Sequence, residues 1–89
     1  MEDILRELSE FNRRIRLGYE LTDEERERYS QLYNSALEFI ENIDNDYAVM
    51  CLSERYLYRK KWPEIAEDLG QYSVDAVRKY ASRAVKKYS

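Results

Sequence analysis

The chain has 89 residues, enough for one modest hydrophobic core but too few for a second independent one. Only two glycines and one proline interrupt a sequence dominated by Leu, Glu, Arg, Lys, Ala and Tyr, a composition typical of an all-helical protein. The single cysteine, Cys51, excludes an intrachain disulfide and a thiol-based metal site, and the absence of histidine removes the commonest general base. We therefore expect no cofactor, no metal and no enzymatic activity.

The start of the chain and its hydropathy predict a cytoplasmic protein. Glu2 and Asp3 stand where a secretory signal carries basic residues, and no apolar run approaches the ~20 residues that span a bilayer. We expect no membrane partner, and we expect Cys51 to be a reduced, partly buried thiol.

The net charge of −3 conceals an uneven distribution of charge along the chain. Residues 1–45 carry twelve acidic and six basic side chains, whereas residues 46–89 carry six acidic and nine basic ones. No acidic residue follows Asp75, although five cations do. A basic end on an acidic body favours a surface that faces a polyanion. A solvated helix face that balances the acidic half explains the charges equally well.

Residues 1–45 predict two helices. Apolar side chains recur every three or four positions over residues 1–17, and Gly18 ends that pattern. Thr22 and Glu25 have the spacing of a capping box, which should start a second helix that runs to about Ile43. We expect the two helices to form an antiparallel hairpin. The predicted buried stripe of the second helix consists of Tyr29, Leu32, Tyr33, Ala36, Leu37, Ile40 and Ile43.

A third helix is predicted over residues 47–58, after a turn at residues 44–46. Three cations, Arg59, Lys60 and Lys61, mark its end. They suit the negative pole of a helix and a phosphate group equally well.

Two further helices follow. The first has about two turns and begins at Trp62, where Pro63 costs little because its missing amide would have no intrahelical partner. Gly70 should end it in the left-handed conformation, and Ser73 should cap a final helix of about fifteen residues. The inward stripe of the final helix is predicted to consist of Val77, Ala81, Ala84 and Tyr88, with Val74 and Val85 beside it. Trp62 and Tyr56 are expected in the core.

The expected fold class is therefore all-α, with about five helices in one compact unit. Residues 1–45 would form the acidic helical hairpin, which serves oligomerisation or completes the core. Residues 46–89 would form a three-helix domain in which a short helix, a glycine turn and a longer basic helix make a helix-turn-helix. Ala66 is small where the two helices cross, and Gly70 takes the backbone around the corner.

Residues 40–88 carry a motif with a known counterpart. It comprises Arg55, Tyr56 and Leu57, the run WPEIAEDLG from Trp62 to Gly70, then Tyr72, Ser73, Val77, Arg83 and Ala84. This pattern resembles region four of bacterial sigma factors and, more closely, phage-encoded transcriptional regulators of the ArpU and RinA type. The resemblance implies an all-helical fold, control of phage late or packaging genes, and DNA reading by the helix after the turn. Two positions depart from the pattern. Gln71 lengthens the turn and would rotate the reading helix by about 100°, and Lys61 replaces the usual capping serine.

The outward positions of the last helix form a mostly cationic stripe that would contact base edges near the helix start and phosphates further along. We predict that Asp75, Ala76, Lys79 and Tyr80 enter the groove of duplex DNA. The full set of predicted DNA-binding residues is Arg59, Lys61, Ser73, Asp75, Ala76, Arg78, Lys79, Tyr80, Arg83, Lys86 and Lys87. A solvated surface charge is an equally good reading of each basic residue, and packing is the better reading of Tyr80.

Two questions about partners stay open. A homodimer through residues 1–43 would double the number of phosphate contacts, although the hairpin could equally complete the core of a monomer. The excess of acid favours a second function, a protein-binding module that docks on RNA polymerase or mimics DNA toward a basic partner. The acids that would act in this way are Asp23, Glu24, Glu25, Glu27, Glu38, Glu41 and Asp44.

Overall fold

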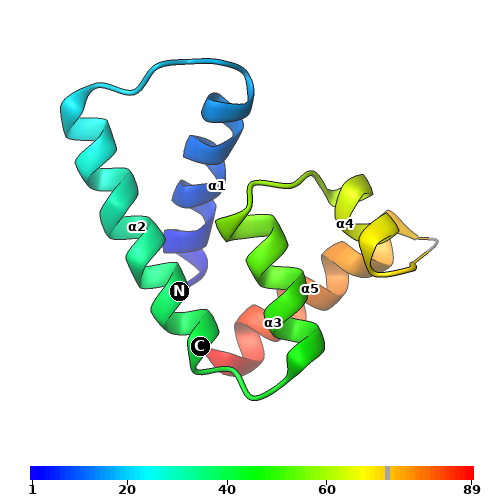
Figure 1. Cartoon of the computed structure of the whole chain (residues 1–89). Helices are drawn as coiled ribbons and strands as arrows, with labels where there is room; N and C mark the ends of the chain where they lie inside the picture. The colour runs from blue at the N-terminus through cyan, green and yellow to red at the C-terminus, as the bar shows by residue number, and fades with distance from the viewer. Residues whose placement is uncertain (72) are drawn as a thin grey trace.

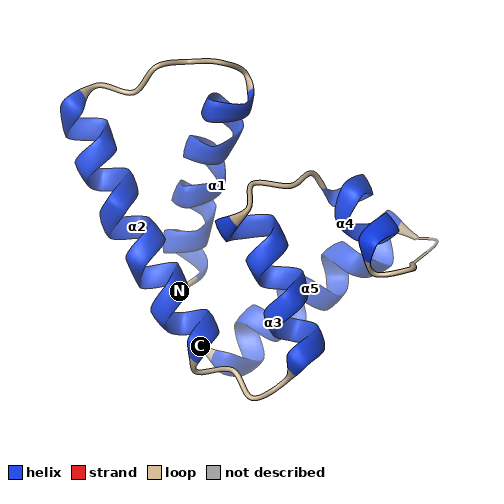
Figure 2. Ribbon diagram, in the orientation of Figure 1, coloured by secondary structure: helices blue, strands red, loops and turns tan. Residues whose placement is uncertain are grey.

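The computed structural model describes residues 1–71 and 73–89, in which helices joined by turns account for the whole fold and no strand occurs. In chain order these helices are α1 (Glu2–Arg16), α2 (Asp23–Glu41), α3 (Asp46–Leu52), the π-helix η1 (Ser53–Leu57), α4 (Trp62–Asp68) and α5 (Val74–Tyr88). The expected all-α fold with five α-helices is confirmed (Figures 1 and 2). Tyr72, which belongs to the turn that Gln71 is predicted to lengthen, lies outside the described residues.

The first two helices form the predicted antiparallel hairpin, with the loop between them at one end (Figure 1). The capping box at the start of α2 is present: Glu25 N donates to Thr22 Oγ1 at 3.2 Å, and Thr22 N donates to Glu25 Oε1 at 3.0 Å. Glu25 also accepts a 2.6 Å hydrogen bond from Arg14 of α1. The Arg14 guanidinium, helped by the Thr22 backbone, lowers the pKa of Glu25 to about 2. The box therefore ties the loop to both helices.

Two of the predicted helices differ in detail from the structure. The second helix, expected to run to about Ile43, ends at Glu41, where the Asn42 side chain turns back to donate to the Glu38 carbonyl at 2.8 Å. Ile43 is nevertheless buried. The third helix is not continuous, because it changes at Ser53 from α-helix to the π-helix η1.

The π-helix connects the hairpin to the second half of the chain. At its end Tyr58 N donates to the Ser53 carbonyl at 3.0 Å, five residues back, and the Tyr56 carbonyl accepts 3.0 Å from Asn12 Nδ2 of α1. Asn12 is 1% exposed, and its Oδ1 accepts from the Tyr29 hydroxyl of α2 at 3.0 Å. One buried amide thus joins α1, α2 and η1.

A single hydrophobic core draws on both halves of the chain. Leu5, Leu8, Leu32 and Ala36 of the hairpin belong to the same buried cluster as Ile65 and Val77 of the second half. Cys51 in α3 is fully buried rather than partly buried as expected, and burial raises the pKa of its thiol to about 11. Tyr56 and Trp62 are only partly buried and pack against the edge of this core, which corrects their predicted placement inside it.

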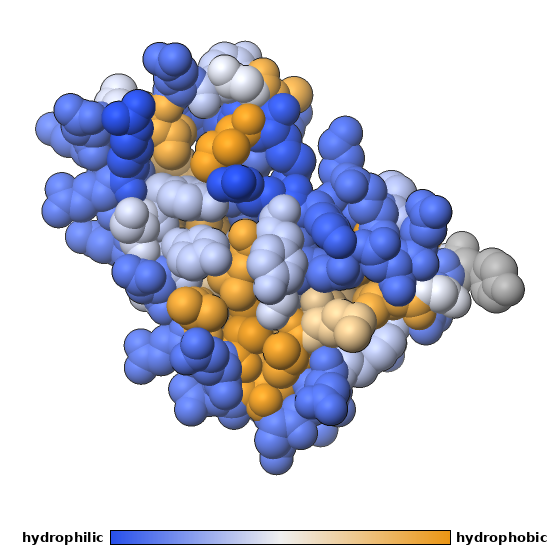
Figure 3. All heavy atoms as spheres, in the orientation of Figure 1, coloured by the Kyte–Doolittle hydropathy of each residue, from blue (hydrophilic) through white to orange (hydrophobic). Residues whose placement is uncertain are grey.

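The face seen in Figure 3 is mostly polar. Its broadest apolar area lies between the end of α2 and α3, and smaller groups of apolar side chains lie near the loop that joins α1 and α2. None of the described helices combines the length and the apolar character that a membrane span requires.

Candidate nucleic-acid interface

The short helix α4 is fixed at both ends by local chemistry. At its start Lys61 occupies the capping position, and its side chain has only donors, so it accepts no bond from the backbone. Glu64 Oε1 instead accepts from Lys61 N at 3.2 Å. At its end Gly70 has φ +69°, and Gln71 N donates to the Ala66 carbonyl at 2.8 Å. The left-handed glycine predicted from the sequence is confirmed.

The final helix α5 begins where it was expected and is separate from α4. Ser73 Oγ accepts from Ala76 N at 3.1 Å, and the helix runs for 15 residues. Ala66 of α4 and Val77 of α5 are 3% and 1% exposed. These two helices contact each other, as the small residue at position 66 predicted.

One side of α5 is buried and the opposite side faces solvent. The buried residues are Val77, Ala81, Ala84 and Val85, close to the predicted stripe. The exposed residues are Asp75, Ala76, Arg78, Lys79, Ser82, Arg83, Lys86 and Lys87. Lys79 and Asp75, one helical turn apart, form a 3.1 Å ion pair in which both side chains are more than half exposed. The exposed residues therefore present more positive than negative charge.

Tyr80 packs against the turn between α2 and α3. It is half-buried, its ring meets the Tyr47 ring edge-on at 4.7 Å, and its hydroxyl lies 3.4 Å from Asn45 Oδ1. Burial raises the pKa of Tyr80. The structure thus gives Tyr80 the packing role rather than a free position for a base contact.

The three cations after η1 point to different neighbours. Arg59 adopts φ +59°, its carbonyl accepts from Arg16 at 3.1 Å, and its guanidinium lies 3.4 Å from the Tyr29 hydroxyl. It borders a shallow cavity of about 330 Å³ against α2, away from the α5 stripe. Lys61 is exposed beside α4. Arg59 and Lys61 were both predicted to contact the DNA backbone. The Arg59 side chain lies against the hairpin, whereas the Lys61 side chain does not.

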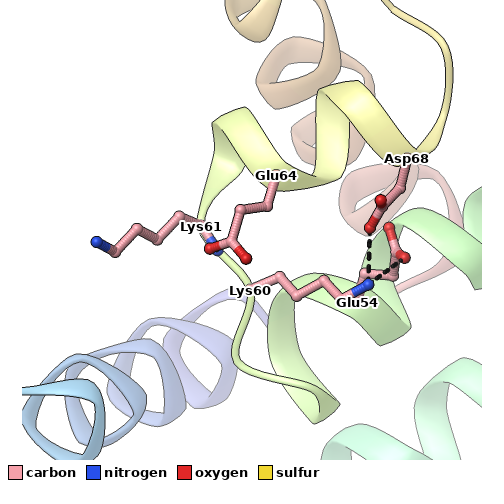
Figure 4. Close-up of polar contacts among 5 residues, drawn as sticks. All are labelled: Glu54, Lys60, Lys61, Glu64 and Asp68. Carbon is pink, nitrogen blue, oxygen red and sulfur yellow. Dashed lines mark hydrogen bonds and ion pairs between the residues drawn. The ribbon is translucent and has the colours of Figure 1, made fainter.

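Lys60 forms an ionic clamp with one carboxylate from η1 and one from α4. Its Nζ lies 2.9 Å from Glu54 Oε1 and 2.7 Å from Asp68 Oδ2 (Figure 4). Asp68 and Glu54, through these bonds, raise the pKa of Lys60 above its usual value. The Glu54 side chain is only 13% exposed, so the lysine neutralises a carboxylate largely removed from water. The clamp fixes α4 relative to η1.

A groove of about 580 Å³ lies between α1 and α5. Glu2, Arg6 and Ser9 border it on the α1 side. On the α5 side it is bordered by Asp75, Arg78, Lys79, Ser82 and Lys86. Trp62 and Tyr56 also line the groove, together with the apolar side chains of Leu5, Ala81 and Val85. Sequence reasoning did not place α1 beside the basic helix, because residues so far apart in the chain meet only in the tertiary fold.

A further cation lies against Trp62, which lines the groove. The Arg55 guanidinium lies over the Trp62 ring, 4.6 Å from its centre, and donates to the Lys60 carbonyl at 3.2 Å. Burial lowers the pKa of Arg55, and the positive charges of Arg16 and Arg78 lower it further.

Comparisons of the chain with protein-family models, with curated proteins and with solved structures gave no match.

Proposed function

We propose that the chain binds duplex DNA in a sequence-specific manner as a small transcriptional regulator of the phage or prophage type, with α4 and α5 acting as a helix-turn-helix. The resemblance of residues 40–88 to the ArpU and RinA regulators supplies the class of protein. The observation that carries the proposal is the solvent-facing cationic side of α5, held by a separate short helix across a glycine turn.

The physical case rests on how an exposed helix reads DNA. The major groove admits one α-helix, whose first turns meet base edges while cations further along meet phosphates. Asp75, Ala76 and Lys79 stand in the first turns of α5, and Arg83, Lys86 and Lys87 follow. The buried opposite side is rich in alanine and valine, which lets α5 lie close to the elements that support it. We assign base contacts to the first group and phosphate contacts to the second.

Ser73 and Arg78 complete the assignment on α5, and Lys61 adds a phosphate contact from the start of α4. Ser73 is exposed and already caps α5, so it can offer its hydroxyl hydrogen to a phosphate while its oxygen accepts from Ala76 N. Arg59 is the predicted residue least suited to a phosphate contact, because its neighbours are Tyr29 and Arg16 of the hairpin.

The decisive experiment removes two cations from the centre of the exposed side. We expect Lys79→Ala combined with Arg83→Ala to abolish duplex binding in a gel-shift titration without unfolding the protein, since both side chains are exposed. The control is Arg26→Ala combined with Arg28→Ala, which removes the same charge from exposed positions of α2 and should leave binding unchanged. Unaltered affinity of the Lys79/Arg83 variant would refute the proposal. Selection of bound fragments from a random duplex library identifies the target sequence.

A protein-binding role for the acidic hairpin is the competing proposal. Asp23, Glu24, Glu27 and Glu38 are exposed on α2, which favours it, whereas Glu25 is engaged by Arg14 and Thr22. Heparin chromatography separates the two functions. Retention that is reversed by salt supports DNA binding, and passage without retention at low salt supports the acidic module, including docking on RNA polymerase.

Homodimer formation through residues 1–43 is a further part of the proposal. The apolar area between the end of α2 and α3 in Figure 3 would suit a second copy, with α2 supplying its part from the hairpin. A dimer would raise affinity because a single module makes few phosphate contacts. Light scattering on the free protein and on the DNA complex measures the number of chains.

A further inference from the structure

We propose that the groove between α1 and α5 holds one phosphate strand of the bound duplex, so that Arg6 and Ser9 of α1 belong to the DNA interface. This inference rests on the proposed function and extends it to a helix that the motif does not include. Neither residue was predicted from the sequence to meet nucleic acid.

More cations than acids border the groove. Arg6 stands on the α1 side, and Arg78, Lys79 and Lys86 stand on the α5 side. Arg55 adds a positive charge next to Trp62, which lines the groove. The acids at the border are Glu2 and Asp75, so four cations stand against two acids, and within this set Lys79 pairs with Asp75 while Arg6 pairs with Asp3 of its own helix. The groove therefore carries a surplus of cations, which is the electrostatic requirement for a phosphate strand.

The groove lies along one flank of α5, the proposed reading helix. A helix in the major groove has one phosphate strand on each side, and the elements next to the helix meet those strands. Arg78 and Tyr80 are about 200° apart around α5 and so mark its two flanks. On the Tyr80 flank lies the α2–α3 turn, which carries the acids Asp44 and Asp46. On the Arg78 flank lies α1, and there the charge suits a phosphate strand.

Helix α1 offers hydrogen-bond donors at a spacing that suits neighbouring phosphate oxygens. Arg6 and Ser9 are three residues apart and therefore lie on the same side of the helix, where an arginine and a hydroxyl can bind neighbouring phosphate oxygens. Figure 1 shows the start of α1 close to the end of α5, and Glu2 and Lys86 both border the groove. Glu2 would be the one unfavourable neighbour of the strand.

The test uses two matched arginines in the full chain. Arg6 pairs with Asp3 at 3.2 Å and Arg26 pairs with Asp23 at 3.3 Å, each three residues apart, with arginine side chains 70% and 65% exposed. We measure the affinity of Arg6→Gln and Arg26→Gln for a duplex of mixed sequence between about 50 and 200 mM salt. Circular dichroism checks that both variants keep their helix content.

We expect Arg6→Gln to weaken binding several-fold and to reduce the slope of log K against log salt by about 0.9, the value for one lost phosphate contact. Arg26→Gln should match the wild type, and Glu2→Gln should bind more tightly. Equal affinities and slopes for Arg6→Gln and Arg26→Gln would overturn the inference. If the Lys79/Arg83 variant loses binding while Arg6→Gln keeps it, the proposed function stands and only the role of α1 fails. If the wild type binds no duplex, both fail.

Discussion

Asn12 is the residue on which the junction of the two halves depends most directly. Its amide group is buried and makes two hydrogen bonds of 3.0 Å, one to the backbone of η1 and one from Tyr29 of α2. Buried polar groups are costly unless they are paired, and here each partner depends on the same side chain. The amphipathic pattern of residues 1–17 gave no sign of this role, because asparagine in a helix normally faces water.

We predict that Asn12→Ala lowers the free energy of unfolding by about 1–3 kcal/mol, because it leaves the Tyr56 carbonyl without the Asn12 donor and the Tyr29 hydroxyl without its acceptor. Urea denaturation monitored by circular dichroism measures the change. Asn34→Ala is the control, since Asn34 is exposed on α2 and its loss should change the stability by less than about 0.5 kcal/mol. Similar midpoints for the two variants would show that the buried amide does not hold the junction together.

At the scale of elements, the position of α4 depends on the Lys60 clamp, since this helix is short and begins without a side-chain cap. An isolated helix of this length is unstable in water, so tertiary contacts must hold it. Lys60 supplies one of them between η1 and α4. Because α4 supports α5, the clamp acts on the candidate interface without belonging to it.

The neighbouring lysines Lys60 and Lys61 give a prediction with opposite outcomes. Lys60→Met should lower the urea midpoint, because the carboxylates of Glu54 and Asp68 then face each other without a cation. Lys61→Met should keep the wild-type midpoint, since Lys61 contributes only its backbone N–H to the bond with Glu64. In DNA titrations Lys61→Met should lose one phosphate contact and the matching part of the salt slope. A Lys60→Met variant as stable as Lys61→Met would contradict the clamp.

The elements that the sequence predicted well are those set by local chemistry. The Thr22 capping box, the left-handed Gly70 and the Ser73 cap each depend on residues within a few positions, and each is present. The π-helix could not be predicted, since the apolar spacing of residues 47–58 is also that of an α-helix. Its presence accompanies the Asn12 bond to Tyr56, a contact between residues far apart in the chain.

In the candidate site, too, the features set by local chemistry were predicted and those set by tertiary contacts were not. The exposed and buried sides of α5 follow from helical periodicity, so Lys79 and Arg83 lie where they were expected. The neighbours of Arg59, Lys60 and Tyr80 are set by tertiary contacts, and the sequence could not distinguish a phosphate-binding cation from one paired inside the protein. The groove beside Arg6 is a property of the tertiary fold alone.

At the scale of the whole molecule, the hairpin and the second half share one hydrophobic core. Leu52 and Leu57 of the second half belong to the same buried cluster as Leu8 and Leu32 of the hairpin, and α2 and α1 both contact η1. A chain of about 40 residues buries too little surface to fold without further support. The acidic hairpin is therefore part of the core that positions the basic helix.

We predict that a fragment of residues 46–89 does not fold by itself. Without the hairpin, Leu52 and Leu57 lose part of their covering and the Tyr56 carbonyl loses Asn12, while the fragment keeps the full entropic cost of ordering its backbone. Circular dichroism of the fragment should show weak helicity with no cooperative thermal transition, and Cys51 should react rapidly with a thiol reagent. In the full chain Cys51 is fully buried with a pKa of about 11, so it should react only as fast as the whole molecule opens. A fragment with a cooperative transition and a protected thiol would instead make residues 46–89 an independent domain, and the hairpin would then be free to serve a partner.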